Sequence, residues 1–91
     1  MKFVIPVHPG EILREMLDDR GLSQSKLARH LGTDAAKINE ICCGRRGISA
    51  EIGIKLSIAF GMDEHFWYDL QKQWELSKVD KSKFKVKRLV A

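Results

Sequence analysis

Side chains that can bind anions are concentrated between residues 20 and 46. This segment carries six basic and two acidic residues, for a net charge of +4. The acidic segment 47–77 follows at net −3, and the tail 78–91 carries net +5. Such segregation suggests that one face or arm of the protein binds a polyanion. For the lysine-rich tail alone, a merely solvated terminus is an equal alternative.

The residues that could catalyse a reaction or bind a metal form no recognisable catalytic or metal-binding motif. No nucleophile-turn motif and no glycine-rich phosphate loop after a strand is present. Cys42 and Cys43 are adjacent, whereas metal ligands are spaced and a vicinal disulfide is strained, so we expect reduced, small apolar fillers near a helix end. His30 is interpreted as a surface residue or phosphate contact, and His8 as a helix cap. We therefore expect no enzyme, no cofactor and no metal.

The length and composition indicate one ordinary globular domain. The chain has 91 residues, of which 44% are hydrophobic and 31% charged, with two Pro and seven Gly. These values exclude a collagenous or disordered chain. No apolar run approaches the roughly 18 residues that span a bilayer, and Pro6 interrupts the short apolar stretch 3–7. We expect a cytoplasmic protein with no membrane partner.

Apolar periodicity and capping residues predict five helices. The first follows His8 and stops at Gly21, and the others span about 24–31, 34–43, 50–60 and 64–77. Further expected caps are Ser23, Thr33, Ser49 and Asp63, with Gly32 and Gly61 as stops. The expected inward residues are Ile12, Leu13, Met16, Leu17, Leu27, Ala28, Leu31, Ile38, Ile41, Cys42, Ile52, Leu56 and Ala59. On the fifth helix, Phe66, Trp67, Leu70 and Trp74 repeat at three- and four-residue intervals. Short connections between these helices favour an all-α bundle.

Both ends of the chain differ from the helical part in period. Residues 2–5 and 83–87 are of extended type, and the latter segment alternates strictly between lysine and apolar residues. We expect two short strands that pair with each other or across a dimer. The expected organisation is a DNA-binding domain over 1–77 and a basic tail over 78–91.

The segment 22–41 has the pattern of a helix-turn-helix. A small residue, Ala28, stands where two helix axes must approach, Gly32 forms the turn, and Ile38 supplies the aliphatic contact. The expected motif spans about 23–42. A plain helical hairpin is the alternative, and the net charge of this segment argues against it.

The second helix of this motif offers the side chains that can read bases. The expected base-reading residues are Ala35, Ala36, Lys37, Asn39 and Glu40. Asn39 can bind adenine through two hydrogen bonds, Lys37 can reach guanine acceptors, and alanine methyls can pack on thymine methyls. The expected phosphate contacts are Gln24, Ser25, Lys26, Thr33, Arg45 and Arg46.

Two acidic residues and one arginine allow more than one role. Asp34 and Glu40 can each orient a basic neighbour or accept a hydrogen bond from cytosine, and we have no preference. Arg46 is alternatively a solvated turn residue or a partner of Glu51.

Several motifs occur together along residues 8–77. They are His8-Pro9-Gly10-Glu11-Ile12-Leu13, Leu22-Ser23-Gln24, Leu27-Ala28, Ile38-Asn39-Glu40-Ile41, Gly44-Arg45-Arg46-Gly47-Ile48-Ser49-Ala50 and Phe66-Trp67. Together they resemble the HigA-type antitoxins of the lambda-repressor-like, Xre-type helix-turn-helix family. The chain departs from better-known lambda-type repressors because alanines stand where glutamines often occur, which raises the share of recognition through DNA shape.

The resemblance implies a five-helix fold and a homodimeric repressor of its own operon. It also implies two partners, double-stranded operator DNA and a small HigB-like ribonuclease toxin that the protein neutralises. Two alternatives stay open: a stand-alone Xre-type regulator without a toxin, and an interaction module that has lost DNA binding.

The aromatic stripe and the tail offer surfaces for partners. We interpret Trp67 as core and expect Trp74, with Phe84 and Val86, to contact a second copy or another partner. The tail is either a toxin-docking strand or an extra DNA arm. Whether the tail, the first helix or the fifth helix holds the toxin stays open.

Overall fold

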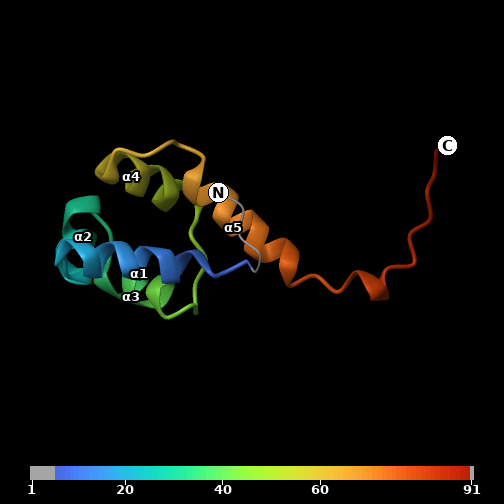
Figure 1. Ribbon diagram of the computed structural model, residues 1–91, viewed down its shortest axis with the longest axis horizontal. Helices are drawn as coiled ribbons and strands as arrows, with labels where there is room; N and C mark the ends of the chain where they lie inside the picture. Colours follow the sequence, from blue (N-terminus) through green and yellow to red (C-terminus); the bar gives the residue numbers. More distant parts are fainter. Residues whose placement is uncertain (1–5, 91) are drawn as a thin grey trace.

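Local capping chemistry sets the ends of five helices (Figure 1). The computed structural model describes residues 6–90. The elements are α1 (Pro9–Arg20), α2 (Gln24–Leu31), α3 (Ala35–Cys42), α4 (Ala50–Phe60), α5 (Phe66–Ser77) and a 3-10 turn, Lys81–Lys83. Within this described range there is no strand. The expected all-α fold of five helices is confirmed.

Three of the predicted N-caps form as expected. The Nδ1 atom of His8 accepts a hydrogen bond from the Gly10 N–H at 2.9 Å. The Ser23 hydroxyl accepts a hydrogen bond from the Lys26 N–H at 3.0 Å, and the Ser49 hydroxyl accepts one from the Ile52 N–H at 3.2 Å. At the C-terminal ends, α1, α2 and α4 stop at glycines in the left-handed conformation. Capping therefore explains why the boundaries of these helices follow from the sequence.

The helices enclose one core centred on α1, α3 and α5. Its most buried large side chains are Leu13, Ile38, Ile41, Leu56 and Trp67, each exposed by 1% or less. Because Trp67 is fully buried, the interpretation of this residue as core is confirmed.

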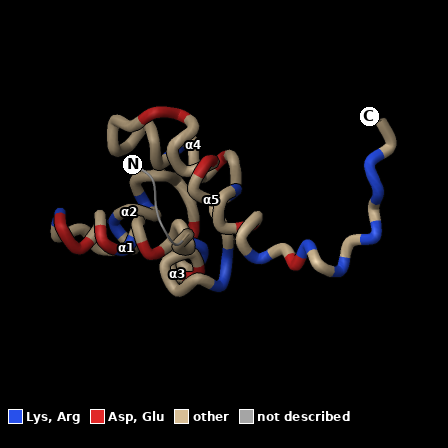
Figure 2. The backbone as a smooth tube through the Cα atoms, turned by 45° about the vertical axis from the view of Figure 1, so that its right-hand side comes forward, with Lys and Arg blue, Asp and Glu red and all other residues tan. Residues whose placement is uncertain are grey.

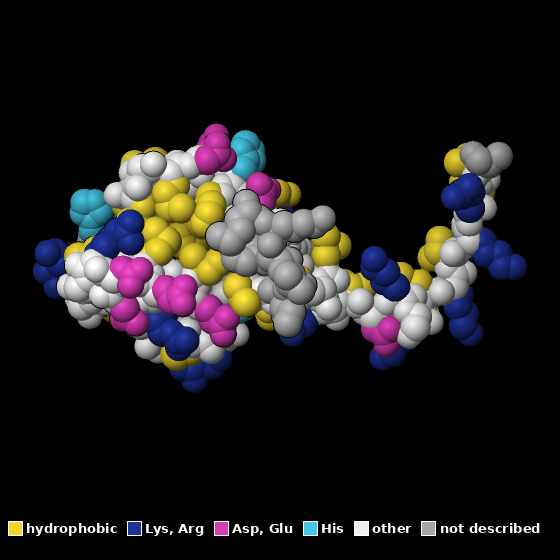
Figure 3. Space-filling view, viewed as in Figure 1, with side chains coloured by type: hydrophobic (Ala, Val, Ile, Leu, Met, Phe, Trp, Pro, Cys, Tyr) yellow, Lys and Arg dark blue, Asp and Glu magenta, His cyan; other side chains and the backbone are white. Residues whose placement is uncertain are grey.

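On the outer surface, acidic side chains are gathered over α1 (Figure 3).

The first turn of α1 presses against the last turn of α3. A Cβ built on Gly10 would overlap the backbone carbonyl oxygen of Ile41 and lie 2.7 Å from the carbonyl carbon. Only glycine permits this approach of two backbones. The His-Pro-Gly sequence therefore starts α1 and also docks it on the helix that carries the candidate base-reading residues.

Some expectations about the helices were wrong. Thr33 belongs to the turn that ends α2, because its N–H bonds to the Ala28 carbonyl at 2.9 Å, so Asp34 is the residue that precedes α3. Asp34 makes no side-chain cap. The fifth helix begins at Phe66 rather than at residue 64, since Asp63 caps a separate turn by accepting from the His65 N–H. Ala59 is exposed on α4, whose buried side includes Gly53 and Ser57 instead.

The expected strand at 83–87 is also absent. The tail leaves the end of α5 and runs away from the helices (Figure 1), so among the described residues its alternating side chains meet no second strand with which to form a ladder. The expected strand at residues 2–5 lies outside the described residues.

The buried cap His8 couples α1 to α5. Its ring meets the Trp74 ring edge-on, at 4.7 Å between centroids and 78° between planes. Burial lowers the pKa of His8 below its ordinary value of 6.5, against smaller opposing effects of the Glu11 charge and the Arg46 backbone. A neutral ring suits this position, because Nδ1 must accept the Gly10 hydrogen bond.

The lowered pKa of His8 predicts a loss of stability in mild acid. The unfolded chain binds the proton more readily, so the stabilising contribution is full above pH 6.5 and is lost as the pH falls through 6.5 towards the folded pKa. We expect the free energy of unfolding to fall more between pH 7.5 and 5.5 in the wild type than in His8→Asn, which keeps a capping acceptor without a titrating ring. Urea unfolding at both pH values measures this difference. Identical pH dependence in the two proteins would contradict the assignment.

Candidate nucleic-acid interface

The helix pair α2 and α3 has helix-turn-helix geometry. Ala28 is 2% exposed where the two helices approach, and Gly32 makes the turn with a φ of 72°. Ile38 and Ile41 hold α3 in the core, being 0% and 1% exposed. With one side of α3 buried in this way, its opposite side is presented outward.

The predicted base-reading residues share this outward side. Ala35, Ala36, Lys37 and Asn39 are exposed, and Glu40 is half-buried. A shallow hollow on this surface is lined by Ala36, Asn39, Glu40 and Arg45. The structure thus brings together methyl groups, an amide and charged groups, which are the chemical types that read base edges in a major groove.

Asn39 is held in place by the first helix of the motif. Its Nδ2 donates to the Oε1 of Gln24 at 3.1 Å. The second N–H and the carbonyl oxygen of the Asn39 amide can still pair with a base. This bond connects a candidate phosphate-binding residue with a candidate base-reading residue, so the two helices present one prearranged surface.

Glu40 orients a basic neighbour in the free protein. Its Oε2 accepts from Arg46 Nε at 3.1 Å, and its backbone carbonyl accepts from the N–H groups of Arg45 and Arg46. The alternative pairing of Arg46 with Glu51 does not occur, because Glu51 pairs with Lys55 at 3.5 Å. Arg45 is exposed, and its guanidinium makes no hydrogen bond or ion pair with the described residues.

The remaining candidate phosphate contacts lie in the first turn of α2 and just after its last residue. Ser25 and Lys26 are exposed, while Gln24 and Thr33 are half-buried. Figure 2 shows basic residues in the segment after α3 and along the tail, and acidic residues on α1 and between α4 and α5. Basic residues of segment 20–46 therefore lie on both sides of the outward side of α3.

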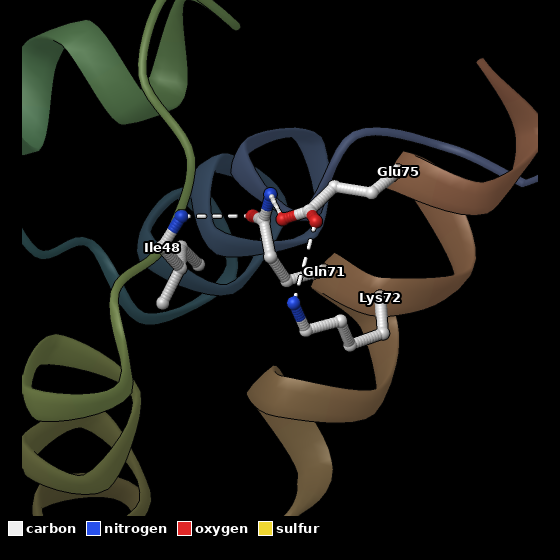
Figure 4. Close-up of polar contacts among 4 residues, drawn as sticks. All are labelled: Ile48, Gln71, Lys72 and Glu75. Carbon is white, nitrogen blue, oxygen red and sulfur yellow. Dashed lines mark hydrogen bonds and ion pairs between the residues drawn. The ribbon is translucent and has the colours of Figure 1, made fainter. Parts of the chain in front are cut away.

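A buried glutamine fixes the loop that carries Arg45 and Arg46 (Figure 4). Gln71 on α5 is 8% exposed, and its Oε1 accepts from the Ile48 N–H at 2.8 Å. Its Nε2 donates to Glu75, which also pairs with Lys72. These contacts lower the pKa of Glu75, with the hydrogen bond from Gln71 as the largest cause.

Sequence reasoning missed Gln71, although a signal was present. The residue stands among Trp67, Leu70 and Trp74 on the apolar side of the fifth helix. A polar side chain in such a stripe is expected to have a buried hydrogen-bond partner. That partner, a loop N–H, is visible only in the folded chain.

The two cysteines have different environments. Cys42 is 3% exposed, and burial raises the pKa of its thiol, in keeping with an apolar filler. Cys43 is exposed, so the expectation that it fills the core was wrong. Its position at the end of α3 turns it outward, with Sγ 3.9 Å from the Asn39 amide oxygen.

Among the described residues no cluster of three metal-ligating side chains occurs, and no helix there is long and apolar enough to cross a membrane.

Fold and surface together define a helix-turn-helix domain of the Xre-like class. The chain belongs to the helix-turn-helix family, whose model matches residues 13–67. It is 41% identical over 75 residues to virulence-associated protein A' of Dichelobacter nodosus. The matched segment covers 81% of this chain and 65% of that protein.

Two solved structures share the whole architecture. The Pseudomonas aeruginosa antitoxin HigA, solved with the higBA promoter, is 35% identical with a TM-score of 0.85, covering 94% of this chain and all of that one. The antitoxin GraA, in complex with its operator, is 36% identical with a TM-score of 0.85, covering 100% and 98% of the two chains. The resemblance to HigA-type antitoxins is confirmed.

Proposed function

We propose that this protein is the antitoxin of a type II toxin–antitoxin pair. It neutralises a small HigB-like ribonuclease and, as a dimer, binds operator DNA to repress its own operon in the cytoplasm. The observation that carries the DNA-binding part is the outward side of α3, where Lys37 and Asn39 are exposed beside Arg45. The likeness to HigA and GraA, each solved with its own promoter or operator, supports both parts.

In this proposal α3 enters the major groove and its flanks hold the backbone. Lys37, Asn39 and Glu40 contact base edges together with the methyls of Ala35 and Ala36. The phosphate contacts are Gln24, Ser25, Lys26, Thr33, Arg45 and Arg46. Because Glu40 already pairs with Arg46, its first role is to aim that guanidinium, and contact with cytosine requires the pair to open.

The dimer places two copies of α3 on successive turns of DNA. Half-sites of this class lie about 34 Å apart, so a surface outside the motif must join the copies. We assign this contact to α5 and the tail. Trp74 is half-buried there, and the tail residues Phe84 and Val86 are 61% and 89% exposed. Apolar side chains exposed to this degree are suited to an interface.

Two substitutions separate base reading from phosphate binding. Arg45→Ala is expected to weaken binding to all DNA sequences alike and to reduce the slope of log K against log salt by about 0.9. Asn39→Ala is expected to reduce the preference for operator over random DNA by about 1–3 kcal/mol. Fluorescence anisotropy over a salt series measures both, and Lys55→Ala, which removes a charge from α4, serves as the control. Equal losses on both DNAs for Asn39→Ala would refute this division of roles.

A growth assay tests the antitoxin part. The small open reading frame beside this gene is expressed alone and then together with the protein. We expect growth arrest by the neighbour alone and rescue by coexpression. Absence of arrest, with expression of the neighbour confirmed, would favour the alternative of a stand-alone Xre-type regulator. That alternative retains the DNA-binding role of α2 and α3.

A further inference from the structure

The tail after α5 carries positive charge that the rest of the described chain does not neutralise. Its basic residues are Lys78, Lys81, Lys83, Lys85, Lys87 and Arg88, and its acidic residue is Asp80. No ion pair of the described residues includes any of them. Lys78 lies over the Trp74 ring at 5.5 Å, and Asp80 accepts a hydrogen bond from the Ser82 N–H. Residues 78–90 are all exposed.

The tail alternates its charges with its apolar residues. After the 3-10 turn the backbone is extended at Phe84, with φ −81° and ψ 131°. The exposed lysines 81, 83, 85 and 87 are the basic edge of the tail. Figure 3 shows the basic side chains spaced along the tail beyond the helices. The result is a basic edge that is open to a polyanion.

Charge argues against two other occupants of this basic edge. Pairing with the tail of a second copy would place two chains of net +5 side by side, and like charges opposite each other destabilise a strand pair, so the dimer contact proposed for Phe84 and Val86 is to the helices of the second copy. A ribonuclease must attract RNA, so its substrate face is basic and would repel the lysines. DNA presents one negative charge per about 1.7 Å of its axis and fits the basic edge.

The reach of the tail is sufficient for DNA outside the half-site read by its own α3. Thirteen residues, 78–90, span about 43 Å when extended, and the molecule is already 51 Å long with the tail projecting (Figure 1). This length exceeds the spacing of about 34 Å between half-sites.

We propose that residues 78–91 form a DNA arm whose lysines bind the phosphate backbone beyond the half-site without reading sequence. This inference rests on the proposed DNA-binding function and adds a second, sequence-independent contact to it. The arm contributes affinity and salt dependence, whereas α3 contributes the discrimination between sequences.

The test compares three full-length proteins: wild type, a variant with lysines 81, 83, 85 and 87 replaced by glutamine, and Leu89→Ser/Val90→Ser as the matched control, which changes two exposed apolar tail residues outside the proposed dimer contact. Anisotropy titrations use a duplex from upstream of the gene and a scrambled duplex at several salt concentrations. For the glutamine variant we expect the slope of log K against log salt to fall by about 3.6 units, which is about 0.9 for each of the four lysines. We also expect the same fold-loss on both duplexes, with an unchanged slope in the control.

Each other outcome overturns the arm. An unchanged slope in the glutamine variant shows that the tail does not bind phosphates. A loss on the upstream duplex alone, or the same loss in the serine control, shows that the tail acts through a protein interface. Failure of the wild type to bind either duplex refutes the proposed DNA-binding function itself, and the arm with it. Thermal unfolding of all three proteins checks that the helices are intact.

Discussion

Gly10→Ala is expected to destabilise the fold by about 3 kcal/mol, since overpacking a rigid site costs about 1–3 kcal/mol and occasionally more. The new methyl group would overlap the Ile41 carbonyl oxygen, and its neighbours there are backbone atoms that cannot swing aside. The first turn of α1 would have to move away from the end of α3. Helix propensity alone predicts the opposite sign, because alanine is favoured over glycine by about 1 kcal/mol in a helix interior.

Urea unfolding of Gly10→Ala measures this effect, with Gly53→Ala as the control. Gly53 also lies in a helix, but a Cβ there would meet side-chain atoms of Trp67 and Ile48 at 3.3 and 3.6 Å, which is tight but not overlapping. We expect a clearly smaller change in the free energy of unfolding for the control. A Gly10→Ala protein as stable as the wild type would show that the contact between α1 and α3 is not the constraint inferred here.

Gln71→Ala is expected to lower stability by about 1–3 kcal/mol and to weaken DNA binding as well. The substitution removes the acceptor of the buried Ile48 N–H, and a buried donor without a partner costs about this amount. Gly47 also packs tightly against the Gln71 side chain, so the loop that carries Arg45 and Arg46 loses its support. We expect the loss of DNA affinity to persist at temperatures where the variant is fully folded.

Gln73→Ala is the matched control for this prediction. Gln73 is exposed on the same helix and makes no side-chain hydrogen bond among the described residues. Circular dichroism gives the stability of each variant, and anisotropy gives its DNA affinity. If Gln71→Ala behaves like Gln73→Ala in both measurements, the anchoring role of Gln71 is refuted.

The helices could be predicted because their signals are local. His8, Ser23 and Ser49 each accept a hydrogen bond within three residues, and Gly21 ends α1 with a conformation that favours glycine. The outward side of α3 could also be predicted, because burial of Ile38 and Ile41 determines which residues remain exposed. These features depend on spacing along the chain, which the sequence states directly.

The features that were missed depend on contacts distant in sequence. Gln71 bonds to Ile48, which is 23 positions away in the sequence, and Gly10 contacts Ile41, which is 31 positions away. The choice of Asp34 over Thr33 was decided by which N–H closes the turn after α2. For the tail, alternation between lysine and apolar residues predicted a strand, but a strand also requires a partner, which its sequence does not supply.

Hydroxyl-radical footprinting on DNA upstream of the gene tests whether two copies of this chain place α3 in successive major grooves. We expect two protected half-sites whose centres lie about 10–10.5 base pairs apart on one face of the duplex. We also expect Asn39→Ala to reduce this protection more than Lys55→Ala does. No protection, or a single protected half-site at saturating protein, would contradict this mode of binding.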